Sequence, residues 1–250
     1  MFFNLFSKNK DEYIVAYSKK LAEVALEDEM DGGILDELIQ YGKDKGLNNK
    51  QLAQAQGMAC DQVFEELYQN GYMNDEDLEL YQELIALCYM MKDDQKYRYT
   101  TIAKRCNAIY KIQEKGLLPR VNKDYANVKY REGENLHFAT PAIWMERNGT
   151  CTTGTVIAKG TPFVAGTLKD TSNGSWKEVK GPGAFWITTD RVGFRGKNGS
   201  FTVELEDLDR AELDQGPLRI YEKGKEEPWA VKMDDYEMAG VILSQLLNGK

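Results

Sequence analysis

Residues 183–196, with the sequence GAFWITTDRVGFRG, decide the fold predicted for the second half of this chain. The side chains of Thr188 and Asp190, at the polar centre of the stretch, can close a turn by hydrogen bonding to the backbone. Apolar residues alternate on either side of that centre, as in strands that bury one face. These residues are Phe185, Ile187, Val192 and Phe194. The stretch therefore predicts an antiparallel β-hairpin.

Short apolar runs separated by turn residues continue on both sides of the hairpin, and they predict further strands. The predicted strands are residues 136–144, 152–158, 162–168, 176–179, 184–188, 192–194, 201–205, 218–221 and 229–232. Hairpin-type turns are expected at 173–174, 197–199 and 223–224. After Asp234, a candidate N-cap, apolar residues at helical spacing predict a closing helix. This pattern predicts a small antiparallel barrel or sandwich plugged by one helix.

The first half of the chain has the period of amphipathic helices. One apolar stripe consists of Ile14, Tyr17, Leu21 and Val24. A second follows the candidate N-cap Asn48 and consists of Leu52, Ala55, Ala59, Val63 and Leu67. Two more helices are expected, one from Asp75 through Met91 and one over residues 95–115. These stripes predict a helical bundle.

A weak internal repeat lies inside this helical half. Residues 36–41 (DELIQY) align with residues 76–81 (EDLELY) at an offset of forty positions. Two helical hairpins packed against each other would bury the Leu and Tyr stripe that the copies share. The repeat therefore predicts that Tyr41 and Tyr81 are both buried.

Together these patterns predict an α+β fold, with an all-α helical bundle followed by a small antiparallel β-barrel that a C-terminal helix closes. A length of 250 residues favours two domains. The expected parts are an apolar and basic N-terminal segment (residues 1–10), a helical domain (11–118), a linker (119–132) and a β domain (133–250).

Two families resemble parts of this sequence. Residues 183–196 are similar to the hairpin of GRAM and pleckstrin-homology-like (PH-like) domains, and the 201–205 strand, a turn at 208–210 and the closing helix continue that plan. Residues 31–38 (DGGILDEL) resemble the repeated acidic turn of the TerB-like family of bacterial stress proteins. These resemblances imply a TerB-like helical domain joined to a PH/GRAM-like barrel, in a bacterial or phage stress or defence context.

Composition excludes several classes of protein. The formal net charge of −8 and a pI of about 5.0 argue against nucleic acid as the main partner, because phosphate binding needs a basic surface. The four cysteines form no CxxC motif, so we expect reduced thiols. Neither a signal peptide nor an apolar run long enough to span a bilayer is evident, which predicts a cytoplasmic location, with the inner membrane face as a second site of action.

The sequence offers little for catalysis. His137 is the sole histidine, and P-loop, GxGxxG and HExxH motifs are absent. We therefore expect neither enzymatic activity nor a cofactor, and we interpret His137 as a residue of a strand edge or turn.

The acidic turn can be aligned with an EF-hand calcium loop. An alignment that puts Gly32 at position six puts Glu27, Glu29 and Asp31 at positions one, three and five. Position twelve is then Leu38 instead of the bidentate Glu, so no metal site is predicted beyond a weak divalent-metal response.

The first ten residues combine large apolar side chains with lysines. Phe2, Phe3 and Phe6 would share one face of a helix, with Lys8 and Lys10 beside them. This segment is predicted to contact a membrane or a partner. The alternative is that the rings pack onto the protein's own core.

The most basic part of the chain is the region 159–197. Besides Lys159 and Lys169, its candidate anion-binding residues are Lys177, Lys180, Arg191, Arg195 and Lys197. The alternative interpretation is a set of solvated loop residues.

The preferred function is that of a non-enzymatic cytoplasmic adaptor or sensor that acts through contacts with a protein partner. The first alternative is a peripheral protein that binds anionic lipid at a membrane surface. The second alternative is a helical module with a weak divalent-metal response.

Overall fold

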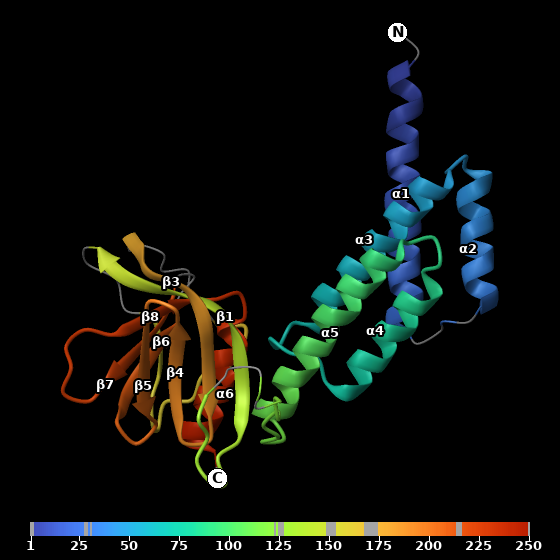
Figure 1. Cartoon of the computed structure of the whole chain (residues 1–250). Coiled ribbons are helices and arrows are strands. Elements are labelled where there is room, and N and C mark those ends of the chain that lie inside the picture. The colour runs from blue at the N-terminus through green and yellow to red at the C-terminus, as the bar shows by residue number, and fades with distance from the viewer. Residues whose placement is uncertain are drawn as a thin grey trace. The chain divides into compact units, whose positions relative to one another are not determined.

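The structure is a computed structural model that describes residues 3–27, 30, 32–122, 124, 128–148, 154–167, 175–213 and 217–249. The chain divides into two compact units, Met1–Tyr110 and Lys111–Lys250. The first unit is helical, and the second contains an antiparallel sheet of eight strands followed by a helix (Figure 1). The predicted α+β class and its order along the chain are therefore confirmed.

The described residues of the first half form five helices, and the last of them runs past the boundary between the units. They are α1 (Phe3–Leu26), α2 (Gly32–Asp44), α3 (Asn49–Leu67), α4 (Asp75–Leu87) and α5 (Asp93–Gln113). The predicted N-cap Asn48 is confirmed, because its side chain accepts a hydrogen bond from the Gln51 amide and Gln51 reciprocates. Helix α4 ends at Leu87, before the apolar residues Cys88 and Met91 that the periodicity included, yet both are buried.

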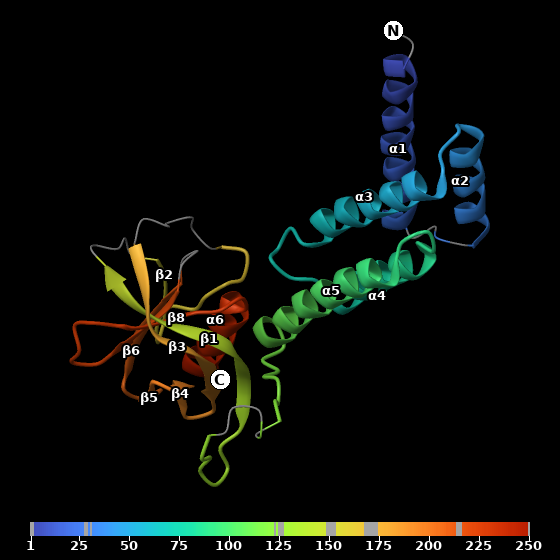
Figure 2. The same cartoon turned by 45° about the horizontal axis from the view of Figure 1, so that its top comes forward.

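The two copies of the internal repeat have different surroundings. Tyr81 on α4 is 0% exposed, and its hydroxyl donates a hydrogen bond to the Cys60 carbonyl at 3.1 Å. Tyr41 on α2 is 40% exposed and lies beside the Lys45 ammonium, 5.6 Å from the ring centroid. Helix α2 lies at the side of the bundle (Figures 1 and 2). The prediction that both tyrosines are buried is therefore wrong for Tyr41.

The strands of the second unit are all paired antiparallel. They are β1 (Leu136–Asn148), β2 (Thr155–Ile157), β3 (Ser175–Thr188), β4 (Arg191–Gly196), β5 (Gly199–Glu204), β6 (Leu208–Leu213), β7 (Leu218–Glu222) and β8 (Trp229–Lys232), followed by α6 (Tyr236–Asn248). Their order in the sheet is β2-β6-β7-β8-β1-β3-β4-β5. The pairing of the described strands is open, with β2 and β5 at its ends, so closure into a barrel stays a prediction.

One strand prediction and one turn prediction are wrong. Residues 162–167 form no strand, because Phe163 is buried against α6, where its amide donates to the Ser244 hydroxyl at 2.8 Å. The expected turn at 208–210 is instead the start of β6, whose exposed Asp209 and half-buried Arg210 resemble turn residues. The runs 176–179 and 184–188 belong to one long strand, β3. Helix α6 starts after Asp235, one residue later than predicted.

The β3–β4 hairpin is buried on both faces. Phe185 pairs with Phe194 and Ile187 with Val192, and all four side chains are fully buried as predicted. Trp186 pairs with Gly193 on the opposite face, where the expected linker supplies Val121, Val128 and Tyr130 as cover. Residues 128–134, called the strap below, therefore pack onto the sheet.

Gly193 is required by the close approach of the Trp186 ring. A Cβ atom at position 193 would lie 2.4 Å from that ring and 2.6 Å from the Phe201 carbonyl oxygen. Overpacking of this kind destabilises proteins by about 1–3 kcal/mol, so Gly193→Ala should lower the free energy of unfolding by that amount. Urea unfolding followed by tryptophan fluorescence measures it, because all four tryptophans lie in the second unit.

The exposed Ser200 on the neighbouring strand provides the control. Ser200→Ala should change the free energy of unfolding by less than about 0.5 kcal/mol. Equal stability of Gly193→Ala and the parent protein would show that Trp186 does not need this space.

Candidate functional site

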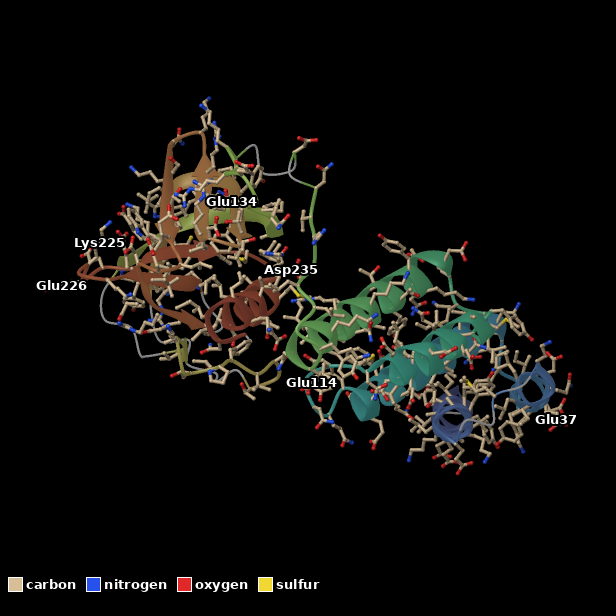
Figure 3. All side chains as sticks on the ribbon, turned by 90° about the horizontal axis from the view of Figure 1, so that it is seen from below. Glu37, Glu114, Glu134, Lys225, Glu226 and Asp235 are labelled. Atoms are coloured by element: carbon tan, nitrogen blue, oxygen red, sulfur yellow. The ribbon has the colours of Figure 1, made fainter. Side chains whose placement is uncertain are left out.

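Arg191, a predicted anion-binding residue, is held in a buried ion pair. Its Nε donates to Glu134 Oε1 at 2.8 Å and its Nη2 to Glu134 Oε2 at 3.0 Å. The Glu134 side chain is 0% exposed and that of Arg191 is 15% exposed. Figure 3 shows Glu134 among the strands of the second unit. Arg191 thus stabilises the fold of this unit through its ion pair with Glu134.

Further hydrogen bonds complete the surroundings of Glu134. The Thr188 hydroxyl donates to Glu134 Oε1 at 2.6 Å and accepts from the Arg191 amide at 3.1 Å. The predicted closing of the hairpin turn is therefore confirmed for Thr188, to which Asp190 contributes its backbone amide at 3.4 Å. The Arg131 amide donates to Glu134 Oε2 at 2.7 Å. Burial alone would raise the pKa of Glu134, but the hydrogen bonds from Arg191, Thr188 and Arg131 outweigh it and lower the pKa from 4.5 to about 2.

Glu134→Ala should lower the free energy of unfolding by about 3 kcal/mol, because it leaves the Arg191 charge partly buried without its partner. Since the pKa of Glu134 is lowered by folding, its stabilising effect is present above pH 4.5 and is lost as the pH falls toward 2. Urea unfolding of both proteins between pH 2 and 7 measures the difference.

The matched control is the ion pair between Glu204 and Arg131, whose side chain is 53% exposed. Arg131→Ala should lower the free energy of unfolding by less than about 1 kcal/mol. A difference between Glu134→Ala and the parent protein that stays constant down to pH 2 would contradict the assigned role of the carboxylate.

The other described anion-binding candidates lie on β3, on β4 and in two turns of the second unit. Lys177 lies opposite Glu146 in the β1–β3 register. Lys180 packs beside Gly199, near Lys197 in the β4–β5 turn and Arg195 at the end of β4. Lys159 follows β2 at the other end of the strand order, and Lys169 lies outside the described residues. Lys180, Arg195 and Lys197 thus lie near the β4–β5 turn, and an anion-binding patch stays a prediction.

The N-terminal segment is only partly described. Phe2 lies outside the described residues, and the side chains of Phe3, Phe6 and Lys8 are likewise not described, although the backbone of these three residues belongs to α1. Lys10 is half-buried. The first turns of α1 extend past the other helices of this unit (Figures 1 and 2). Among the described helices, none combines the length and apolar character needed to cross a bilayer.

The acidic turn lies largely outside the described residues, which include Glu27 but neither Glu29 nor Asp31. Figure 3 shows Glu37 on the outer side of α2. Within the described ranges, no group of three or more His, Cys, Asp or Glu side chains is arranged to hold a metal ion.

His137 and the cysteines Cys60 and Cys88 are buried in the described part of the chain. His137 on β1 is buried, with Nδ1 2.7 Å from the Pro119 carbonyl oxygen and Nε2 3.2 Å from the Thr189 hydroxyl. Cys60 and Cys88 are fully buried with their sulfur atoms 4.0 Å apart. The hydrogen bond with Cys88 and burial raise the pKa of the Cys60 thiol, which disfavours the nucleophilic thiolate.

An aromatic cluster in the second unit forms a different candidate site. It joins Trp144 on β1, Phe194 on β4, Phe201 on β5 and Trp229 on β8. The Phe201 and Trp229 rings are stacked, with centroids 4.9 Å apart. Trp144 meets the other three edge-on, at centroid distances of 5.3–5.8 Å. Four strands thus hold the rings in a fixed arrangement.

A surface groove of about 690 Å³ lies against the two tryptophans and is called the tryptophan groove below. It is lined by Trp144, Met145, Glu146, Lys225, Glu227, Pro228 and Trp229. Trp144 is 9% exposed, whereas Trp229 is half-buried. The groove therefore combines an aromatic wall with charged groups from β1 and from the turn between β7 and β8.

The basic residue of the groove has an ion-pair partner, whereas its two acidic residues have none among the described residues. The Lys225 ammonium lies 2.7 Å from Glu222 Oε2 and 5.4 Å from the centre of the Trp229 ring. The hydrogen bonds that Lys225 and Trp229 donate lower the pKa of Glu222. Glu146 and Glu227 are exposed and form no ion pair with any described residue. Figure 3 shows Lys225 and Glu226 at the outer tip of the β7–β8 turn.

No local sequence pattern predicted this groove. Its tryptophans are 85 positions apart, and each was interpreted only as part of a strand. The sequence feature that could have indicated it is the segment 225–229 (KEEPW), in which charged residues and a proline directly precede a tryptophan at a strand end.

No family model and no curated protein sequence matches this chain.

Proposed function

We propose that this protein is a non-enzymatic adaptor that binds a segment of a partner protein in the tryptophan groove. The observation that carries the proposal is the fixed pair Trp144 and Trp229 at a surface groove of peptide-sized volume. Tryptophan is enriched among the residues that dominate binding energy in protein interfaces. Aromatic-lined grooves are also a recurrent means of recognising extended peptides.

The rigidity of the groove favours binding. The Trp229 ring is held by stacking on Phe201 and by its Nε1–H, which lies 3.4 Å from Glu222 Oε2. Trp144 is fixed between Phe194, Phe201 and Trp229. A preorganised wall loses little side-chain freedom when a ligand binds, so more of the contact energy contributes to affinity.

The wider setting of the proposal rests on the sequence resemblances. A PH/GRAM-like barrel for the second unit and a TerB-like domain for the first would place the protein in the cytoplasm of a bacterium, in a stress or defence response. The adaptor would then present its groove to a protein partner while the helical unit makes a separate contact.

A selection from a displayed library of random peptides tests the proposal. The full-length chain should enrich peptides that Trp229→Ala no longer binds, with a loss of affinity of about thirtyfold or more, as expected for an interface residue worth about 2 kcal/mol. Fluorescence anisotropy of the labelled peptides measures the affinities.

The control variant is Trp176→Ala, which removes a tryptophan of β3 that does not line the groove. It should bind the selected peptides as the parent chain does. Failure to enrich any peptide, or equal binding by Trp229→Ala, would remove the groove as the binding site.

A second candidate function is peripheral membrane binding through the start of α1. Positions 3 and 6 lie eleven residues, about three turns, before the buried Ile14 and Tyr17. The helix face that enters the bundle core therefore continues to these two positions. Phenylalanine and lysine together favour the boundary between lipid head groups and acyl chains.

Deletion of residues 1–10 tests this candidate. Co-sedimentation with vesicles of phosphatidylglycerol and phosphatidylcholine should be lost, while the melting temperature stays within about 2 °C, because the described core of the helical unit starts at Tyr13 and Ile14. Vesicles of phosphatidylcholine alone are the control. No sedimentation of the full-length chain would eliminate membrane binding, and a large drop in melting temperature would show that the segment packs onto the protein's own core.

A further inference from the structure

We infer that the occupant of the tryptophan groove is a basic peptide segment that inserts an arginine or lysine side chain beside Trp144 and Trp229. This inference rests on the proposed function and specifies the ligand of the same site. It is carried by the combination of aromatic rings, two carboxylates without an ion pair among the described residues, and a resident cation.

The charge of the groove favours a cation. Lys225 is the one basic residue among the described residues of the lining, and its charge is compensated by Glu222 at 2.7 Å. Glu146 and Glu227 remain without an ion pair in the described part of the chain, so the lining carries an excess of negative charge. A ligand ammonium or guanidinium would supply the missing partner for both carboxylates.

Trp229 already holds a cation of the protein itself. The Lys225 ammonium lies 5.4 Å from the ring centre, within the range of a cation–π interaction. Tryptophan is the aromatic side chain with the strongest attraction for cations. Because Lys225 is half exposed and lies in a turn, a ligand cation can compete with it for this ring.

The location of other charges agrees with a basic ligand. Glu226 flanks Glu227 in the same exposed turn, while the ammonium of Lys223 is bound to the Glu206 carbonyl oxygen at 2.5 Å. The net charge of −8 also attracts basic segments from a distance. An acidic ligand would instead meet the carboxylates of Glu146 and Glu227, which would repel it.

The inference makes opposite predictions for the two kinds of charge in the groove. The probe is the blocked pentapeptide Gly-Arg-Gly-Arg-Gly, titrated into the full-length chain while tryptophan fluorescence is recorded. The double variant Glu146→Gln, Glu227→Gln should bind it about tenfold more weakly, because two charge pairs are lost. Lys225→Gln should bind it about threefold more tightly, because the competing cation is gone and Glu222 is released.

Matched probes isolate the charge of the ligand. The same peptide with citrulline in place of arginine keeps the shape but lacks the charge and should bind at least about tenfold more weakly. The lysine peptide should bind, and the glutamate peptide should not. Both glutamates are exposed, so their variants should melt at the temperature of the parent chain, which circular dichroism checks.

The outcomes separate this inference from the proposed function. Equal binding of the arginine and citrulline peptides would overturn the inference, as would weaker binding by Lys225→Gln together with tighter binding by the double variant. If the library selection yields peptides that need Trp229 but contain no arginine or lysine, the groove is a peptide site and the basic ligand is wrong. If neither the selection nor the arginine peptide shows binding that depends on Trp229, both proposals fail.

Discussion

The buried ion pair between Glu134 and Arg191 is a constraint that joins several parts of the second unit. It connects the segment before β1 to the turn between β3 and β4, and Arg191 Nη2 also donates to the Lys129 carbonyl oxygen at 2.5 Å. Two charges removed from water are stable only when hydrogen bonds satisfy them. Here Thr188, the Arg131 amide and the Lys129 carbonyl do so, which fixes the strap and the hairpin turn together.

The strap gives the hairpin its second buried face. Antiparallel sheets usually have one face on the core and the other in water. In β3 and β4 the core side holds Phe185 and Phe194, while the other side holds Trp186 under Val128 and Tyr130. Gly193 is the opposing residue that leaves room for the indole ring. The same sheet continues through β1 to the tryptophan groove, where Trp144 meets rings from β4, β5 and β8.

The basic residues of the region 159–197 are not all exposed, unpaired charges. Arg191 is bound to Glu134 within the fold, Lys159 follows β2 at the other end of the strand order, and Lys180 packs beside Gly199. The exposed turn between β7 and β8 carries Glu226 and Glu227 beside the aromatic wall. This distribution of charge supports the proposal of a cation-binding groove, and the anion-binding patch stays a prediction.

Local patterns predicted most of the helices and strands, the α+β class and the cap at Asn48, because helix periodicity, strand alternation and capping depend on residues close together in the chain. Local patterns gave wrong predictions where burial or pairing depends on a distant element. Phe163 is covered by α6, and β6 pairs with β7 and β2. Tyr41 and Tyr81 differ in exposure because their helices have different neighbours. The candidate site lay wholly beyond local patterns. Trp144 and Trp229 meet only because β1 pairs with β8, and the role of Arg191 depends on Glu134, 57 positions away. Only the tertiary structure decided that Trp144 meets Trp229 and that Arg191 meets Glu134. Packing and electrostatic interactions are strong over a few ångströms, and the fold determines which distant side chains come that close.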